Sequence, residues 1–135
     1  MKQKLKLALV GAGERGQYCY APYAKMHGYE IEFVAVADPP KGRREKFVQD
    51  YHVPAEGVFE TAEQFFARPR MADAVLICTQ DSQHYAYACQ AIDLGYSILL
   101  EKPISPSARE CLDLQRRAEE KGTQIMVCHV MRYTK

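Results

Sequence analysis

The chain has 135 residues, of which 47% are hydrophobic and 26% are charged, a composition typical of a globular domain and not of a disordered one. Lysine and arginine number 18 against 17 acidic residues, so the net charge of +1 favours neither nucleic acid nor an anionic membrane as a partner. A chain of this length fits one domain with a buried core.

The N-terminal stretch MKQKLKLALVGAG has lysines before an apolar run, as a secretory signal does. The run is only about six residues long and ends in a glycine-rich turn, so we interpret it as a first strand. No apolar run approaches the roughly 18 residues that a membrane helix needs. The five cysteines form no C-x-x-C pair, which is typical of reduced thiols, and we expect a cytoplasmic protein without a metal site.

Short apolar runs alternate with helical patterns along the chain. Because these runs are nearly continuous, they predict strands buried on both faces, and the helices between them predict the crossovers of a parallel sheet. The predicted fold is therefore α/β, a doubly wound parallel sheet of about six strands in one three-layer domain of the Rossmann type. The expected strands are residues 5–10, 31–38, 57–59, 73–79, 97–101 and 124–130.

The helical segments carry start and stop signals. Thr61 is followed three residues later by Gln64, a pattern that predicts a helix cap. We expect Ser105 to cap the last helix, with Pro106 at its first position and Gly122 at its end. The predicted helices are residues 41–52, 61–68, 82–95, 105–122 and part of 11–28.

The stretch GAGERG, residues 11–16, matches G-x-G-x-x-G between a predicted strand and a predicted helix. In that position Gly11 permits a tight turn, Gly13 lets the backbone approach a diphosphate, and Gly16 lets the helix pack closely on the strand. The N–H groups of such a turn face an anion at the positive end of the helix. The alternative is that these glycines only form a turn, but the flanking strand and helix favour a dinucleotide-binding motif.

Asp38 ends the second predicted strand, 22 residues after Gly16. An acid at about this spacing binds the adenosine ribose hydroxyls and repels a 2′-phosphate, which favours NAD. Lys41, Arg43 and Arg44 follow at once, and basic residues there can accommodate the 2′-phosphate of NADP. The further alternative for these three is a solvated helix start.

Three polar loops are expected to meet at one edge of the sheet. In a sheet of strand order 3-2-1-4-5-6, ligands bind at the carboxyl ends of strands one and four. The glycine turn follows strand one, TQDSQH (79–84) follows strand four, and EKP (101–103) follows strand five. In the second loop, Asp81 has helix capping as an alternative role, and His84 has the alternative of a histidine satisfied within the fold.

Lys102 is the candidate catalytic residue, because an unpaired ammonium at the end of a central strand is costly unless it faces a cleft. A lysine aimed at a substrate hydroxyl can hydrogen-bond it and help to move its proton. Glu101 is near enough to orient or charge-balance Lys102, and Pro103 restricts Lys102 to extended geometry and permits a cis bond. The alternative is a surface ion pair at the strand end.

These motifs resemble the nucleotide-binding half of the Gfo/Idh/MocA oxidoreductases, sugar and polyol dehydrogenases that use NAD or NADP. The likeness spans nearly the whole chain and rests on GAGERG, AVAD, TQDSQH, GYSILLEKPIS and CHVMRY. Two departures stand out. The family's T-P-N loop reads Thr79-Gln80-Asp81 here, and His129 stands where asparagine is common.

The resemblance implies a role for each matching residue. The glycine turn would bind the pyrophosphate, Asp38 the ribose, and the loop after strand four would lie along the nicotinamide. The tip of strand five would border the nicotinamide, with Lys102 contacting the substrate hydroxyl as the catalytic residue. The implied cofactor-binding residues are Gly11, Ala12, Gly13, Glu14, Arg15, Gly16, Asp38, Thr79, Asp81, His84, Glu101, Lys102 and Arg132.

Family members continue into a second domain that shapes the substrate pocket and supplies a catalytic histidine, and residues 1–135 stop about where it begins. We therefore expect a fragment or a single-domain relative that binds the cofactor without turnover. The resemblance also implies a sugar or polyol as the small-molecule substrate and a homo-oligomer formed through the second domain. Two other functions stay open, a non-catalytic NAD(P)-sensing module and a methyltransferase that uses S-adenosylmethionine.

Overall fold

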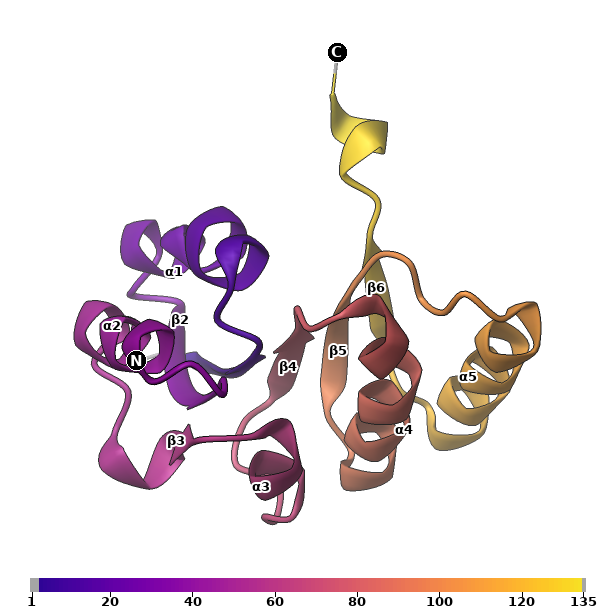
Figure 1. The fold of residues 1–135 in the computed structure, drawn as a ribbon, viewed down its shortest axis with the longest axis horizontal. Coiled ribbons are helices and arrows are strands. Elements are labelled where there is room, and N and C mark those ends of the chain that lie inside the picture. Colours follow the sequence, from indigo (N-terminus) through magenta and orange to yellow (C-terminus); the bar gives the residue numbers. More distant parts are fainter. Residues whose placement is uncertain (1–2, 135) are drawn as a thin grey trace.

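The computed structural model describes residues 3–134 and has a parallel six-stranded sheet as its central layer (Figure 1). The strand order is β3-β2-β1-β4-β5-β6, which confirms the predicted doubly wound α/β fold. Chain order therefore reverses between β1 and β4, as predicted. The strands are β1 (Leu5–Val10), β2 (Ile31–Ala37), β3 (Val58–Phe59), β4 (Ala74–Ile77), β5 (Ser97–Glu101) and β6 (Ile125–Cys128).

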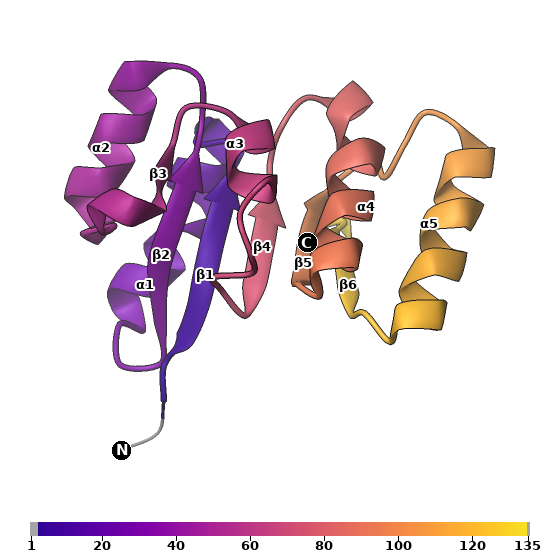
Figure 2. The ribbon, with the colours of Figure 1, turned by 90° about the horizontal axis from the view of Figure 1, so that it is seen from below.

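Helices cover both faces of the sheet and complete a three-layer domain (Figures 1 and 2). One face carries α1 (Pro22–Met26) and α2 (Lys41–Tyr51). The other face carries α3 (Ala62–Phe66), α4 (His84–Leu94) and α5 (Ala108–Lys121). The division follows from crossovers of one hand, because the chain moves outward from β1 in one direction and from β4 in the other.

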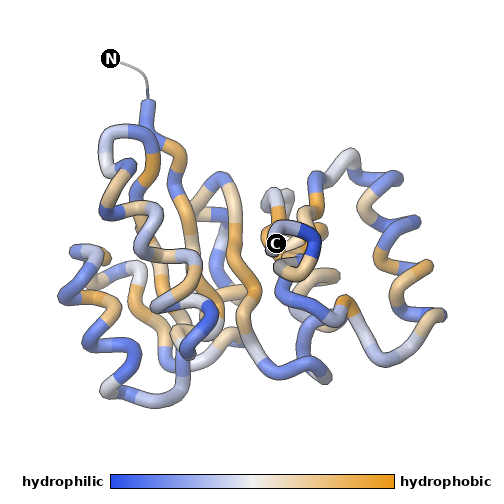
Figure 3. Tube along the Cα trace, turned by 90° about the horizontal axis from the view of Figure 1, so that it is seen from above, coloured by the Kyte–Doolittle hydropathy of each residue, from blue (hydrophilic) through white to orange (hydrophobic). Residues whose placement is uncertain are grey.

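Successive strand residues alternate between two apolar cores. In β1, Ala8 and Val10 face the core beneath α3 and α4, whereas Leu9 faces the core beneath α1 and α2. Phe65 of α3 fills the first core and Phe47 of α2 fills the second. Both faces of the strands are thus buried, which explains the continuous apolar runs in the sequence. Figure 3 shows the apolar stretches along the central strands and the hydrophilic segments on the outer helices.

The cap of α3 is the predicted one. The Thr61 hydroxyl accepts a hydrogen bond from the N–H of Gln64 at 3.2 Å, and the Gln64 side chain accepts one from the N–H of Glu60 at 2.9 Å. The predicted glycine stops are also present, since Gly95 and Gly122 end α4 and α5 with φ values of 81° and 65°.

The predicted cap of α5 at Ser105 is wrong. The helix begins at Ala108, and its cap is Ser107, whose hydroxyl accepts from the N–H of Glu110 at 3.4 Å. Ser107 has a glutamate three residues later and so forms a capping pair that Ser105 does not have. Ser105 supports this cap from outside the helix, because its hydroxyl accepts from the Ser107 N–H at 3.0 Å and donates to the Glu110 carboxylate.

The segment after the glycine turn differs from the single helix that we predicted. Residues Arg15–Tyr20 form a π-helical turn, in which the Ala21 N–H donates to the Gly16 carbonyl at 3.0 Å, and Pro22 then begins α1. Proline lacks an N–H and is favoured at a first helical position, so a new helix starts there. π-Helical turns are rare in proteins overall, but those that occur are often found at functional sites.

Within residues 3–134 no helix is long and apolar enough to cross a bilayer.

Candidate functional site

A groove of about 580 Å³ lies at the carboxyl ends of β1, β2 and β4, where the chain order reverses. We call it the switch-point groove. The strand ends form its floor, and the glycine turn and the loop after β4 form its sides. The predicted site residues that line it are Gly11, Gly13, Glu14, Arg15, Asp38 and Thr79.

The three motif glycines have different surroundings. Gly11 has a φ of +93°, and a Cβ there would lie 2.5 Å from the carbonyl oxygen of Cys78. A Cβ at Gly16 would lie 2.5 Å from the Gly11 oxygen and 2.8 Å from Leu9 Cδ1. At Gly13 the nearest atom to a Cβ is Arg43 Nη1, at 3.7 Å. Gly11 and Gly16 are therefore required by the fold itself, whereas Gly13 leaves open space beside the groove.

Asp38 follows β2 at the edge of the groove and is only 6% exposed. Its Oδ2 atom is buried without a hydrogen-bond partner among the described residues. Burial raises the pKa of Asp38, against the opposing charges of Arg43 and Arg44 and the backbone N–H of Ala12. A buried carboxylate oxygen with a free lone pair is an acceptor that suits the hydroxyl of a bound ligand.

Of the three basic residues after Asp38, only Arg43 lines the groove. Arg44 is buried, and its Nη1 donates to the carbonyl oxygens of Asp38 at 2.7 Å and Pro39 at 3.1 Å. The Lys41 side chain is exposed, and its Nζ lies 3.7 Å from Glu45 Oε1 on the next turn of α2. Arg44 therefore shapes the loop, and Lys41 is the solvated helix start that we considered for all three.

The loop after β4 enters the groove through Thr79, whose Oγ1 is buried and lacks a hydrogen-bond partner in the described part of the chain. The next residues form a single 3₁₀ turn, Asp81–Gln83, before α4. Its cap is Gln80, whose N–H donates to Gln83 Oε1 at 3.2 Å. Asp81 is exposed and does not act as the cap, so its contact with a ligand stays a prediction.

His84 is fully buried and joins two of the loops. Its Nδ1 lies 2.6 Å from the carbonyl oxygen of Pro103, and its Nε2 lies 3.1 Å from that of Thr79. In either tautomer the ring N–H therefore has a carbonyl acceptor. This is the alternative of a satisfied histidine, and it makes His84 a support that holds the ends of β4 and β5 together.

Glu101, at the tip of β5, joins the glycine turn to the strand that carries Lys102. The Tyr20 hydroxyl donates to the Glu101 carboxylate, and Arg15 Nε lies 3.9 Å from the same oxygen. The Lys102 N–H donates to the other carboxylate oxygen at 2.9 Å. Glu101 thus orients the backbone of Lys102, but its charged partner is Arg15 and not the Lys102 ammonium.

The predicted convergence of the three loops is therefore present. Of the predicted site residues, however, some line the switch-point groove and the others lie outside its lining. Lys102 is exposed and does not line the groove, and the bond between Lys102 and Pro103 is cis. Arg132 lies in a turn past β6 that projects away from the sheet toward the C-terminus (Figure 1). The predicted residues outside the groove lining are Ala12, Gly16, Asp81, His84, Glu101, Lys102 and Arg132.

Tyr20 is a site residue that the sequence did not reveal. It ends the π-helical turn, and burial, followed by contacts with Cys128 and Glu101, raises the pKa of its hydroxyl. A raised pKa keeps the phenol protonated and able to donate. No motif marks this position, because its partner Glu101 is 81 residues away in the chain.

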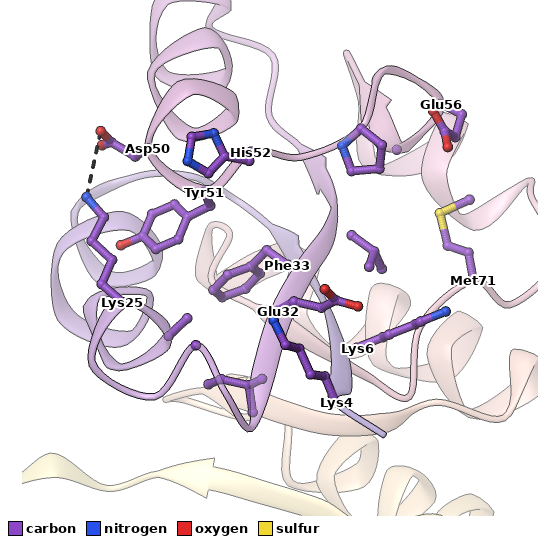
Figure 4. Close-up of a pocket in the computed structure, with 16 residues that line it drawn as sticks. Lys4, Lys6, Lys25, Glu32, Phe33, Asp50, Tyr51, His52, Glu56 and Met71 are labelled. Carbon is purple, nitrogen blue, oxygen red and sulfur yellow. Dashed lines mark ion pairs between the residues drawn. The ribbon is translucent and has the colours of Figure 1, made fainter. Parts of the chain in front are cut away.

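A larger pocket of about 790 Å³ lies at the amino ends of β1 and β2, on the opposite rim of the sheet (Figure 4). It exists because β3 pairs only with Val36 and Ala37, which leaves the start of β2 without a neighbour on that side. Lys25 and Asp50 form an ion pair of 3.7 Å at its margin. None of the predicted site residues lines this pocket, so its size does not make it the site.

Comparisons with known proteins identify the family to which the chain is similar. Residues 5–129 match the family model Gfo/Idh/MocA, described as an oxidoreductase family with an NAD-binding Rossmann fold. Two Bacillus subtilis enzymes are similar over 96% of the chain. These are the scyllo-inositol 2-dehydrogenase (NADP(+)) IolW, 26% identical, and scyllo-inositol 2-dehydrogenase (NAD(+)), 29% identical. The chain spans 34% and 36% of their lengths, about a third.

A solved structure shares the fold. It is the WlbA dehydrogenase from Bordetella pertussis in complex with NADH and UDP-GlcNAcA, with a TM-score of 0.81 and 20% identity. The match covers 93% of this chain and 37% of that one.

Proposed function

The chain belongs to the Gfo/Idh/MocA oxidoreductase family, and from that membership we propose that it binds a nicotinamide dinucleotide in the switch-point groove. It would serve as the cofactor domain of a dehydrogenase that acts on a sugar or polyol. The observation that carries the proposal is the buried Asp38 oxygen, which has no hydrogen-bond partner within residues 3–134, beside the open backbone of Gly13. The two features match the two needs of such a ligand, a hydroxyl acceptor and a close approach to phosphate.

Different residues of the groove would bind different parts of the dinucleotide. The N–H groups of the turn from Gly11 to Gly16 would hold the diphosphate, and Asp38 would accept from the ribose hydroxyls. Thr79 would reach the nicotinamide side with its free hydroxyl, while Asp81 and Arg132 would add contacts at the rim. When bound, the nicotinamide supplies the hydride acceptor or donor.

Lys102 is proposed to act on the substrate and not on the cofactor. Its exposed ammonium would donate a hydrogen bond to the substrate oxygen and polarise it while the adjacent carbon exchanges hydride. His84 and Glu101 would fix the loop that presents Lys102, through the carbonyl of Pro103 and the N–H of Lys102. The relatives are about three times as long as the matched region. Further substrate contacts and a homo-oligomer interface are therefore proposed to come from another domain of a cytoplasmic enzyme.

NAD is the proposed cofactor, because the carboxylate of Asp38 lies where a 2′-phosphate would be repelled. Arg43 is the one basic residue after Asp38 that lines the groove and could offset this repulsion. The dissociation constants of NADH and NADPH, measured by fluorescence titration, test the preference. A clear preference for NADPH would contradict it. An Arg43→Ala variant, with Lys41→Ala as control, would then show whether Arg43 holds the phosphate.

Thermal unfolding with NAD, NADP and S-adenosylmethionine tests the function itself. A ligand that binds the folded state raises the midpoint, by the equivalent of about 2.7 kcal/mol at a hundred times its dissociation constant. We expect NAD to raise the midpoint and S-adenosylmethionine to leave it unchanged. A shift with the methyl donor alone would replace the dehydrogenase proposal with a methyltransferase.

A further inference from the structure

The carboxylate of Glu101 is held at the tip of β5 by two hydrogen-bond donors and one ionic contact. The side chain is only 5% exposed. It accepts from the Tyr20 hydroxyl and from the Lys102 N–H at 2.9 Å, and Arg15 Nε lies 3.9 Å away. A buried carboxylate is costly unless such partners satisfy it. The position of Glu101 therefore depends on groups that come from the glycine-turn segment.

Tyr20 and Arg15 are at the two ends of the same π-helical turn, Arg15–Tyr20. Arg15 is half exposed and lines the groove, whereas the Tyr20 hydroxyl is directed inward to Glu101. The pKa of Tyr20 is raised by burial, so its hydroxyl stays a donor over the neutral pH range. Of the two side chains, Tyr20 makes the direct hydrogen bond and Arg15 the longer ionic contact.

We propose that Tyr20 is a positioning residue of the cofactor site, which fixes Glu101 and thereby the strand tip that carries Lys102. Through this contact the segment that binds the diphosphate also sets the geometry on the nicotinamide side. The inference rests on the proposed function, because it assumes that a dinucleotide spans from the glycine turn to the tip of β5. It assigns Tyr20 no contact with the cofactor or the substrate.

The test compares two ligands in the Tyr20→Phe variant. NADH spans both sides of the site, whereas ADP reaches only the turn and Asp38. Without the Tyr20 hydroxyl the tip of β5 is no longer held beside the nicotinamide side, so we expect NADH to bind Tyr20→Phe about tenfold more weakly, with ADP binding within about twofold of wild type. Equal loss of affinity for both ligands, or no loss for NADH, overturns the inference.

Tyr18→Phe is the matched control, because Tyr18 lies on the same turn and is 60% exposed. It should bind both ligands as wild type does, and thermal unfolding without ligand checks that each variant is folded. If NADH binding weakens equally in Tyr18→Phe, the effect belongs to the turn in general and the inference is wrong.

A second variant keeps the proposal testable if Tyr20→Phe unfolds. Glu101→Leu removes the acceptor, so it should weaken NADH binding while sparing ADP binding, and unchanged NADH binding in this variant overturns the inference. Where Tyr20→Phe folds, adding it to Glu101→Leu should cause less than about twofold further change. Independent, additive effects would mean that Tyr20 does not act through Glu101. A wild-type protein that binds neither ligand refutes the proposed function as well, whereas normal wild-type binding with an unaffected Tyr20→Phe refutes this inference alone.

Discussion

Replacing Gly13 with alanine separates the binding role of the glycine turn from its structural role. The new methyl group would have Arg43 Nη1, at 3.7 Å, as its nearest neighbour, which is an ordinary contact at the end of a flexible side chain. The fold should therefore tolerate it. Where the backbone is compatible, glycine to alanine stabilises by about 0.4–1 kcal/mol, so the free energy of unfolding should be unchanged or slightly higher.

The same methyl group should interfere with the cofactor. It would project into the space where the backbone faces the diphosphate, and the ligand would be displaced from one N–H group. Each hydrogen bond to a charged group contributes about 1.5–3 kcal/mol, which predicts a loss of NADH affinity of about 10- to 100-fold. Fluorescence titration with NADH measures this loss, and urea unfolding of the same sample measures stability.

Alanine substitutions at two other glycines serve as controls for Gly13→Ala. Gly42→Ala, in α2, has no atom within 4 Å of its Cβ and should leave NADH binding unchanged. Gly16→Ala would place its Cβ 2.5 Å from the Gly11 oxygen, and such overpacking costs about 1–3 kcal/mol of folding stability. If Gly13→Ala binds NADH like wild type, the diphosphate does not lie on this turn and the assignment of the groove is wrong.

Three further predictions address other residues. Burial raises the folded-state pKa of Asp38 above its ordinary value of 3.8, so its ionised form destabilises the fold once the pH rises through that range. Asp38→Asn should thus raise the free energy of unfolding at pH 7, and in urea titrations this gain should disappear near pH 3. The same variant should bind NADH more weakly. A gain in stability that does not depend on pH would contradict the burial argument. His84→Leu removes the ring N–H that donates to the carbonyl of either Thr79 or Pro103, and the loss should cost about 1–3 kcal/mol in urea unfolding. A smaller loss would mean that the ring does not support these loops. In a full-length enzyme, Lys102→Ala should lower kcat with little change in cofactor affinity, and near-normal kcat would remove Lys102 from the mechanism.

The larger features of this domain could be predicted because local patterns encode them. Strands buried on both faces require continuous apolar runs, so the strands could be located, and their expected order followed from the doubly wound class that the alternation with helices indicated. The turn at Gly11 needs a residue that tolerates a φ of +93°, and glycine in that position marks it directly. Asp38 was identified because a fixed spacing relates it to the turn.

The roles of the basic residues could not be separated from the sequence. Lys41, Arg43 and Arg44 are neighbours in the chain, yet the start of α2 points them in different directions. Arg44 turns inward to the carbonyl of Asp38, Lys41 faces solvent, and Arg43 faces the groove. The helical rotation of about 100° per residue separates Arg43 from Arg44, whereas Lys41 and Arg44 differ because only the Arg44 side chain reaches back to the carbonyls of Asp38 and Pro39.

The sequence by itself determined the sheet, the phosphate-binding turn and the acid beside it, because each depends on residues close together in the chain. Only the tertiary structure decided that Tyr20 contacts Glu101 across 81 residues and that His84 joins the loops after β4 and β5. These contacts depend on how parallel strands align and how deeply each side chain is buried. Neither property leaves a local pattern in the sequence, since both arise from the packing of segments that are distant along the chain.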